Sequence, residues 1–429
     1  TYGKVTHEVV LHLLNVVDKY RDSLNLVNTH RSTLKGAFLY QNMKYPNKTA
    51  AIRMGDSRRV KKISCENLYL KVLAIAHRRS MNVYKNLAIQ RIQGLYNDEQ
   101  SFIPSIENQG LEWENPTKLF WGIDVDLENH SETVEYHSSA KFPHAGIGIL
   151  RNYNCENREE HGLMGFIGGA HYVHSHLTGI EMELYGSGIV MGAGSGDPKA
   201  TSARSSDVYR NYHRIYAGHN TVIINGDSKG THPGSWKWDN ILYQDKSEII
   251  GIEPNINMDQ TNSDGPFYPV SDNFSFVTVE LDDNVNDALQ QRTLSIIRTS
   301  QTTGYYLDIF RSKSNGVNNF HDYIYHNYGE QLSLTSGGST ITNGIGSTDQ
   351  TRYSSDLNTV WSYTTTSSAF IDFPGWQYFT NLNATDQTTQ SITGEFNVDK
   401  IGASMHFKTP SGVNRDYTVC IAPPILETE

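Results

Sequence analysis

Residues Gly168–Gly188 read GGAHYVHSHLTGIEMELYGSG, and they place His171, His174 and His176 at the start of a segment in which apolar and polar residues alternate. Alternation predicts a β-strand, and because alternate residues share one face of a strand, His174 and His176 should point the same way. Histidine titrates near neutrality and is a common metal ligand. A solvated strand end would explain one such histidine, but three within six residues indicate a functional site.

The sequence on either side of this stretch predicts two kinds of structure. Within Val5–Tyr96 the apolar residues recur at helical spacing, which predicts amphipathic helices packed on one another. From about Phe120 onward, short segments rich in aromatic and β-branched residues are separated by Gly, Asn, Asp and Ser, which predicts antiparallel sheets stacked into a sandwich. We therefore expect a multidomain α+β chain with helices first and a large antiparallel β-sandwich after them.

The length of the chain predicts more than one domain. It has 429 residues, whereas a single core stops growing at about 250–300. We place a helical domain at residues 1–112, an antiparallel β-sheet domain at 113–330 and strands that complete the sandwich at 331–429. No apolar run reaches about 18 residues, so no membrane span is predicted. Because the sequence opens on Thr1 without an apolar leader, we expect a processed or trimmed protein whose targeting signal is no longer visible. We expect a secreted or periplasmic location.

Composition narrows the class of partner. Charged residues make up 19% of the chain, Tyr and Gly are abundant at 25 and 35 residues, and this mix is typical of proteins that present aromatic and amide surfaces to carbohydrate. The net charge of −10 argues against nucleic-acid binding, although a local basic cluster can still attract a polyanion. The three cysteines, Cys65, Cys155 and Cys420, allow at most one disulfide and form no CxxC metal motif.

Five segments together carry a resemblance to a known family. They are KFPHAGIGILRN (141–152), GGAHYVHSHLTGIEMELYGSG (168–188), AGHNTVIINGD (217–227), YYLDIFRSKS (305–314) and FHDYIYHN (320–327). In this order, after a helical region, they resemble the heparinase II/III-type polysaccharide lyases. The motif sequence HYVHS…ELYG is most similar to that of marine lyases that act on ulvan. The resemblance covers most of residues 1–330 and implies a partial α/α toroid joined to an antiparallel β-sandwich.

The resemblance also implies a reaction. A lyase of this kind removes the C5 proton of a uronic acid and expels the sugar oxygen on C4, so it needs groups that neutralise the carboxylate, a base and an acid. The resemblance places the sheet-side catalytic histidine at His174 and the facing catalytic tyrosine at Tyr2, in a Tyr-Gly turn before a helix. The alternative for Tyr2 is a frayed terminal residue.

A structural zinc ion is the cofactor that the resemblance implies. Its ligands would be His176, His219 and an acidic residue, but position 192, where the family has that acid, is Gly192. Asp197 follows closely and could take its place, which would give an ordinary zinc donor set of two histidines and a carboxylate. Without a metal, His176 would contact substrate or support the site.

Further residues are candidates for substrate binding because they combine aromatic or basic side chains with positions near these motifs. Arg suits planar anions such as carboxylate and sulfate, and aromatic rings stack on sugars, although loop exposure or core packing would look the same in the sequence. The candidates are His171, Arg204, Tyr209, Tyr212, Arg214 and Trp238.

These patterns favour a polysaccharide lyase that cleaves a uronate-containing, sulfated, ulvan-type polymer by β-elimination and leaves 4,5-unsaturated uronate ends. An alginate or glycosaminoglycan lyase of the same superfamily is the first alternative. A glycoside hydrolase would need two carboxyl groups about 5–10 Å apart, which no motif nominates. A non-catalytic carbohydrate-binding protein is the remaining alternative, favoured if the short helical part leaves the site incomplete.

Overall fold

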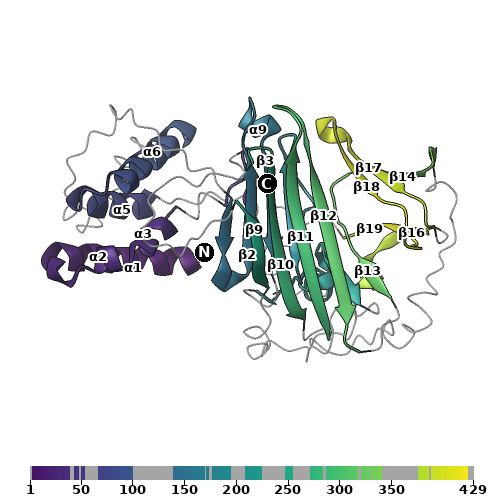
Figure 1. Cartoon of the computed structure of the whole chain (residues 1–429), viewed down its shortest axis with the longest axis horizontal. Helices are drawn as coiled ribbons and strands as arrows, with labels where there is room; N and C mark the ends of the chain where they lie inside the picture. The colour runs from purple at the N-terminus through teal and green to yellow at the C-terminus, as the bar shows by residue number, and fades with distance from the viewer. Residues whose placement is uncertain are drawn as a thin grey trace. The chain divides into compact units, whose positions relative to one another are not determined.

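The computed structural model describes residues 2–38, 43–47, 50–53, 66–99, 139–169, 171–172, 176–194, 208–224, 247–254, 271–283, 287–316, 320–329, 331–340, 375–385 and 388–423. The chain forms two compact units, and each is described by itself. The first comprises Thr1–Lys44, Lys61–Ser138 and Asn257–Tyr268, and the second comprises Tyr45–Val60, Ser139–Ile256 and Pro269–Glu429. The predicted order of helices followed by antiparallel sheets is confirmed (Figure 1). The predicted domain limits at residues 112 and 330 stay predictions.

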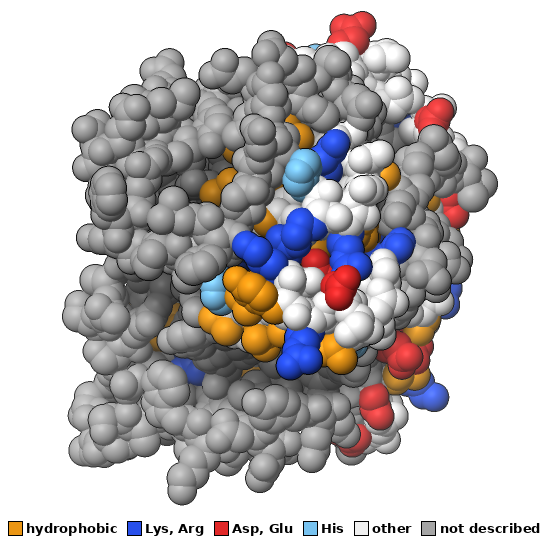
Figure 2. All heavy atoms as spheres, turned by 90° about the vertical axis from the view of Figure 1, so that its left-hand side faces the viewer, with side chains coloured by type: hydrophobic (Ala, Val, Ile, Leu, Met, Phe, Trp, Pro, Cys, Tyr) orange, Lys and Arg blue, Asp and Glu red, His pale blue; other side chains and the backbone are white. Residues whose placement is uncertain are grey.

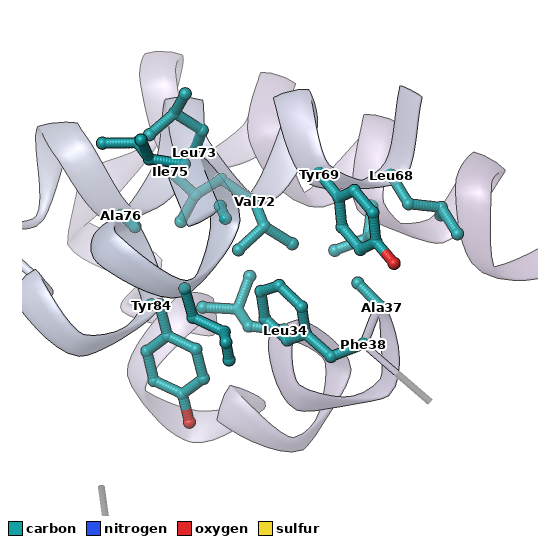
Figure 3. Close-up of a cluster of buried hydrophobic side chains, with 14 of the residues drawn as sticks. Leu34, Ala37, Phe38, Leu68, Tyr69, Val72, Leu73, Ile75, Ala76 and Tyr84 are labelled. Atoms are coloured by element: carbon teal, nitrogen blue, oxygen red, sulfur yellow. The ribbon is translucent and has the colours of Figure 1, made fainter. Parts of the chain in front are cut away.

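The described part of the first unit is helical. It contains α1 (Tyr2–Tyr20), η1 (Asp22–Leu24), α2 (Leu26–Thr29), α3 (Arg31–Gly36), α5 (Glu66–Arg78) and α6 (Asn82–Glu99). Apolar side chains of these helices meet in one core, where Leu34 and Val72 are fully buried and the rings of Phe38 and Tyr69 stack with centroids 5.6 Å apart (Figure 3). The helical spacing of apolar residues in the sequence is the direct cause of this packing.

Buried charges join α1 to α5 in the same unit. Asp18 of α1 is 6% exposed and accepts Arg78 at 3.3 Å and Arg79 at 2.6 Å from the end of α5. Seven residues before Arg78 on α5, Lys71 Nζ lies 3.1 Å from Oε1 of Glu8 of α1. These pairs fix how the two helices face each other, because a buried charge without its partner is costly.

Two antiparallel sheets make up the sandwich of the second unit. The first runs in the order β1 (Ala140–Phe142), β2 (Ile147–Asn152), β3 (Leu163–Gly168), β6 (Glu181–Gly186) and β7 (Ile189–Met191). The second runs β12 (Gly304–Ser314), β11 (Ala288–Arg298), β10 (Phe274–Asp283) and β9 (Glu248–Glu253), strands that lie side by side in Figure 1.

The sandwich core lies between these sheets. Val277, Val279 and Leu281 alternate along β10 and are buried, and they pack in one cluster with Leu150 of β2 and Leu184 of β6. The sheets approach closely at Gly148 of β2, where a Cβ atom would lie 2.6 Å from Val277 Cγ2. The period-two alternation of the sequence therefore predicts the inward face of β10 correctly.

The remaining strands pair in smaller sheets. Two-stranded pairs join β4 (His171–Tyr172) to β5 (His176–Leu177), β8 (Val222–Ile224) to β13 (His321–Tyr323) and β16 (Thr380–Ala384) to β19 (Thr418–Ile421). A four-stranded sheet follows the order β15 (Ser339–Thr340), β14 (Gln331–Ser336), β17 (Ile392–Val398) and β18 (Ala403–Thr409). The strands after residue 330 therefore pair with one another, and Met405 of β18 packs against the sandwich core.

Short helical turns connect the strands. They are η3 (Pro143–Ala145), α9 (Arg158–His161), the π-helical turn η5 (Tyr209–His213), η6 (Tyr216–Gly218), η7 (Trp376–Tyr378) and η8 (Asp399–Ile401). Cys155 and Cys420 are both unpaired, and their thiol pKa values are raised by burial. Among the helices that the structure describes, none combines the length and the apolar character that crossing a membrane requires.

Candidate functional site

The three histidines of the motif are divided between β4, β5 and the connection between these strands. His171 begins β4, His176 begins β5, and β4 pairs with β5 so that Tyr172 lies opposite His176. His174 lies in the connection 173–175, outside the described residues, so the prediction that it shares a face with His176 stays a prediction. Tyr2 is the first residue of α1, within the helix rather than in a turn before it, and its side chain also lies outside the described part.

His176 and His219 lie together in the interior of the second unit. Both are fully buried, and their rings meet edge to face with centroids 5.7 Å apart. His219 directly follows η6. The fold therefore brings together two residues that are 43 positions apart in the sequence. Two imidazoles at this separation can bind one small ion or one polar ligand atom between them.

A buried carboxylate orients His219. Nδ1 of His219 lies 2.8 Å from Oε1 of Glu181, the first residue of β6. A carboxylate accepts, so Nδ1 donates, and in the corresponding neutral tautomer the lone pair is on Nε2. In the part of the chain that the structure describes, this Nε2 is buried and has no hydrogen-bond partner. Metal-binding histidines commonly donate one ring N–H to a carboxylate and bind the metal through the other ring nitrogen. His219 and Glu181 have this arrangement.

Two further histidines surround the pair and stay neutral. Burial is the largest cause that lowers the pKa of His213 to about 3, and electrostatic interaction with the neighbouring His176, His219, Arg53 and His326 adds to it. Burial, together with His219, lowers the pKa of His326 to about 3. Near neutral pH the imidazoles of His213 and His326 therefore carry no charge.

Residues 45–47 and 50–53 lie against the face of β6 that points away from the sandwich core. Tyr45 donates its hydroxyl to Glu183 Oε2 at 2.8 Å, and its ring stacks on Tyr185 with centroids 5.5 Å apart. The backbone N–H of Arg53 donates to the same Glu183 oxygen at 3.3 Å, and Arg53 Nη1 donates to the carbonyl of Gly194 at 3.0 Å. This covering segment brings a buried arginine close to the histidine cluster.

Sequence reasoning did not identify Glu181, Glu183 or Arg53 as members of this site. The signal was present in the segment IEMEL, whose alternation correctly assigns Met182 and Leu184 to the core. The same alternation assigns the two glutamates to solvent, whereas both are buried, at 4% and 0% exposed, because Tyr45, Arg53 and the turn carrying His219 contact them. A carboxylate buried in this way has to be paired.

Several predicted substrate-binding residues form part of the interior. Tyr212 is 1% exposed and packs with Ile215, Tyr216, Trp376 and Phe379. Tyr209 is 1% exposed, and the guanidinium of the fully buried Arg214 lies 5.7 Å from the centroid of its ring. Their roles in substrate binding stay predictions. The predicted residues that lie outside the described part of the chain are Arg204 and Trp238, and the side chain of His171.

The backbone conformation at Gly192 explains why the acidic metal ligand that the resemblance implies is absent at this position. Gly192 has φ of +61°, a conformation that favours glycine, and a Cβ atom there would lie 3.1 Å from the hydroxyl of Tyr325. An acidic side chain is therefore disfavoured at this position. The substitute ligand Asp197 lies outside the described residues, and among those described no three His, Cys, Asp or Glu side chains form a metal-binding group.

Comparison with known proteins supports the resemblance. Residues 1–136 match the family described as endo-acting ulvan lyase 2nd domain. A curated endo-acting ulvan lyase of Formosa agariphila is 38% identical to this chain over 418 residues, which is 97% of this chain and 48% of that protein. This chain is related to the endo-acting ulvan lyases. It spans about half the length of this ulvan lyase.

Two solved structures also match this chain. Heparinase III matches with a TM-score of 0.42 and 11% identity, covering 98% of this chain and 51% of that chain. Heparan sulfate lyase HepC from Pedobacter heparinus matches with a TM-score of 0.37 and 11% identity, covering 96% of this chain and 58% of that chain. The predicted relationship to ulvan lyases is thus confirmed by the sequence relative.

Proposed function

We propose that this chain acts in a polysaccharide lyase that cleaves a sulfated, uronate-containing polymer of the ulvan type by β-elimination and leaves 4,5-unsaturated uronate ends. The observation that carries the proposal is the 38% identity to an endo-acting ulvan lyase, because it extends over 97% of this chain and so includes both the helical unit and the sheet unit. A relationship confined to one motif would support the fold more than the reaction.

The charge of the candidate site supports this chemistry. Removing the C5 proton of a uronate places negative charge next to a carboxylate, so the site must supply positive charge or hydrogen-bond donors. Arg53 and Arg214 are 2% and 0% exposed and lie with the histidine cluster of the sheet unit. In this proposal His174, two positions from the buried His176, takes part in proton transfer, and Tyr2 supplies the second acid–base group.

The surface supports binding of an anionic polymer. Figure 2 shows several Lys and Arg side chains gathered on one face, with acidic and hydrophobic side chains beside them. The chain as a whole carries a net charge of −10, so attraction of a polyanion has to come from such local clusters. We also propose a secreted or periplasmic location, since a large polysaccharide is met outside the cytoplasmic membrane.

The proposal includes a structural zinc ion with His176, His219 and Asp197 as ligands. The described donors fit such an ion, because Nε2 of His219 is buried without a hydrogen-bond partner in the described structure while Glu181 holds its Nδ1. When bound, the ion would supply fixed positive charge beside the histidine cluster. The chain's own residues orient the two imidazoles and exclude water from them.

The test is to incubate the protein separately with ulvan, alginate, heparan sulfate and chondroitin sulfate and to follow the ultraviolet absorbance of the unsaturated uronate. We expect a rise with ulvan, its loss in His174→Gln, and normal activity in His406→Gln, whose side chain is 64% exposed on β18. A parallel sample dialysed against a chelator, with metal content measured, tests the zinc ion.

The other outcomes identify the alternatives. A rise with alginate or a glycosaminoglycan alone would move the substrate to that class. New reducing ends without the absorbance would identify a hydrolase and remove the roles given to His174 and Tyr2. Binding of ulvan without any cleavage would support the non-catalytic alternative for this chain.

A further inference from the structure

A second charged network, centred on a buried arginine and open to solvent at Tyr323, contacts the backbone beside the His219–Glu181 pair. Its centre is Arg292 of β11, which is fully buried, and its other members are Asp308 of β12 and Tyr323 of β13. Arg292 Nε and Nη2 donate to the two carboxylate oxygens of Asp308, each at 2.8 Å, and Nη2 also donates to the Tyr323 hydroxyl at 3.1 Å. Tyr323 in turn donates to Asp308 Oδ2 at 2.6 Å.

The remaining nitrogen of Arg292 reaches out of its own sheet. Nη1 donates to the backbone carbonyls of Ile180 at 2.7 Å and of Asn220 at 2.5 Å. A guanidinium has five N–H donors, and these contacts occupy all five. Burial alone would lower the pKa of Arg292, but the carboxylate of Asp308 raises it above the ordinary value, so the side chain stays charged.

The two carbonyls are the immediate neighbours of the histidine–carboxylate pair. Ile180 precedes Glu181, and Asn220 follows His219. Glu181 and His219 lie 38 positions apart in the sequence, on β6 and on the turn before β8, and a single nitrogen of Arg292 ties both backbones together. Arg292, from the opposite sheet, thus holds the two backbone segments that carry the 2.8 Å contact between His219 Nδ1 and Glu181 Oε1.

We propose that Arg292 is a positioning residue that sets His219 against Glu181, and that Asp308 and Tyr323 hold its guanidinium in the required plane. The effect on catalysis rests on the proposed lyase function, whereas the effect on the pair does not. Lysine could not take this role, because its ammonium has three donors on a single nitrogen, whereas these contacts use five donors spread over the three nitrogens of a planar fork. The side chain of Asn220 supports the same turn by donating to the Met182 carbonyl at 3.2 Å.

The chain offers a matched control on the same strand. Arg298 also lies on β11, is 4% exposed, and donates to Asn152 Oδ1 at 3.1 Å and to the Asn152 carbonyl at 2.9 Å. Both of these side-chain contacts are with Asn152 of β2, and neither involves the His219–Glu181 pair. Arg298→Lys therefore changes a buried arginine of the same strand, and loses its contacts, without altering the contacts of the His219–Glu181 pair.

The experiment compares Arg292→Lys with Arg298→Lys in three measurements on the full chain. The first is the proton NMR signal of the His219 imidazole N–H bonded to Glu181, assigned by its loss in His219→Gln. The second is kcat and KM on ulvan, and the third is urea unfolding. Tyr323→Phe, which removes one contact to the fork, provides a milder variant if Arg292→Lys does not fold.

We expect Arg298→Lys to leave the His219 signal in place and kcat within about twofold of the parent. Arg292→Lys should shift or abolish the signal and lower kcat at least about tenfold with a smaller change in KM, since it disturbs geometry rather than substrate contact. Tyr323→Phe should shift the signal in the same direction by less.

Two results would overturn the proposal: the same His219 signal in Arg292→Lys and Arg298→Lys, or the absence of a hydrogen-bonded His219 signal in the parent. A shifted signal in Arg292→Lys together with a parent that cleaves none of the polysaccharides would uphold the positioning role and refute the lyase function. The two proposals therefore fail separately.

Discussion

Acidification should destabilise the sheet unit through two histidines that are buried in their neutral form. His213 and His326 are 1% and 8% exposed. Burial is the largest cause of the lowered pKa of both, and the neighbouring charges of the site add to it, so that each has a pKa of about 3 in the folded chain. In the unfolded chain each returns to the ordinary value of 6.5.

The sign follows from which state binds the proton. Between pH 6.5 and 3 the unfolded chain is protonated at these residues and the folded chain is not, so their contribution to stability is complete above the unfolded pKa and is lost as pH falls toward the folded pKa. At pH 5 an unfolded histidine gains RT ln(1 + 10^1.5), which is about 2 kcal/mol. The two together should cost about 4 kcal/mol between pH 8 and pH 5.

Urea unfolding followed by the signal of the sheet unit, repeated at half-unit steps of pH, measures this loss. Each histidine should contribute a slope of about 1.4 kcal/mol per pH unit below pH 6. His326→Gln should remove the slope of one histidine, whereas His406→Gln, at an exposed position of β18, should leave the profile of the parent. Equal slopes in the parent and in His326→Gln would refute the reasoning.

Two substitutions test the packing that supports the site. Leu294→Ala empties a fully buried position of β11 between the two sheets and should lower the free energy of unfolding by about 2–5 kcal/mol in a urea titration; a loss below about 1 kcal/mol would mean that the sheets close over the cavity. Tyr45→Phe removes a donor to the buried Glu183 and should cost about 1–3 kcal/mol by the same method, with Tyr305→Phe, 55% exposed on β12, as the neutral control. Equal effects of the two tyrosine changes would show that the Tyr45 hydroxyl adds nothing.

The sequence predicts those parts of the fold that depend on local periodicity. The spacing of Leu11, Leu68 and Val72 predicts helices that pack on one another, and these side chains are fully buried in one core. The alternation along β10 predicts its core face. In each of these patterns, apolar residues that face the core recur at a fixed spacing of a few residues. This spacing can be recognised in the sequence without knowing which surface the element packs against.

The contacts of the site depend on parts of the chain that are far apart, and local patterns do not record them. Glu183 reads as the solvent face of a strand, but Tyr45, at a distance of 138 positions in the sequence, buries it. Arg292 reads as one more polar residue of β11, although it reaches Ile180 across 112 positions. The pairing of His176 with His219 was expected only because a related family brings equivalent motifs together.

The His-Asn-Thr turn shows why such a short motif gains meaning only in its context. His219 directs its side chain to Glu181, while the side chain of the next residue, Asn220, accepts the backbone N–H of His326 at 2.5 Å and its carbonyl accepts Arg292. Neighbouring residues of the turn thus serve different purposes, since one presents an imidazole and the other locks the backbone that carries it. A substitution at Asn220 that kept its volume but lost its amide would leave the His219 imidazole unchanged but loosen its position, because the turn would lose the contacts that join it to Met182 of β6 and to His326.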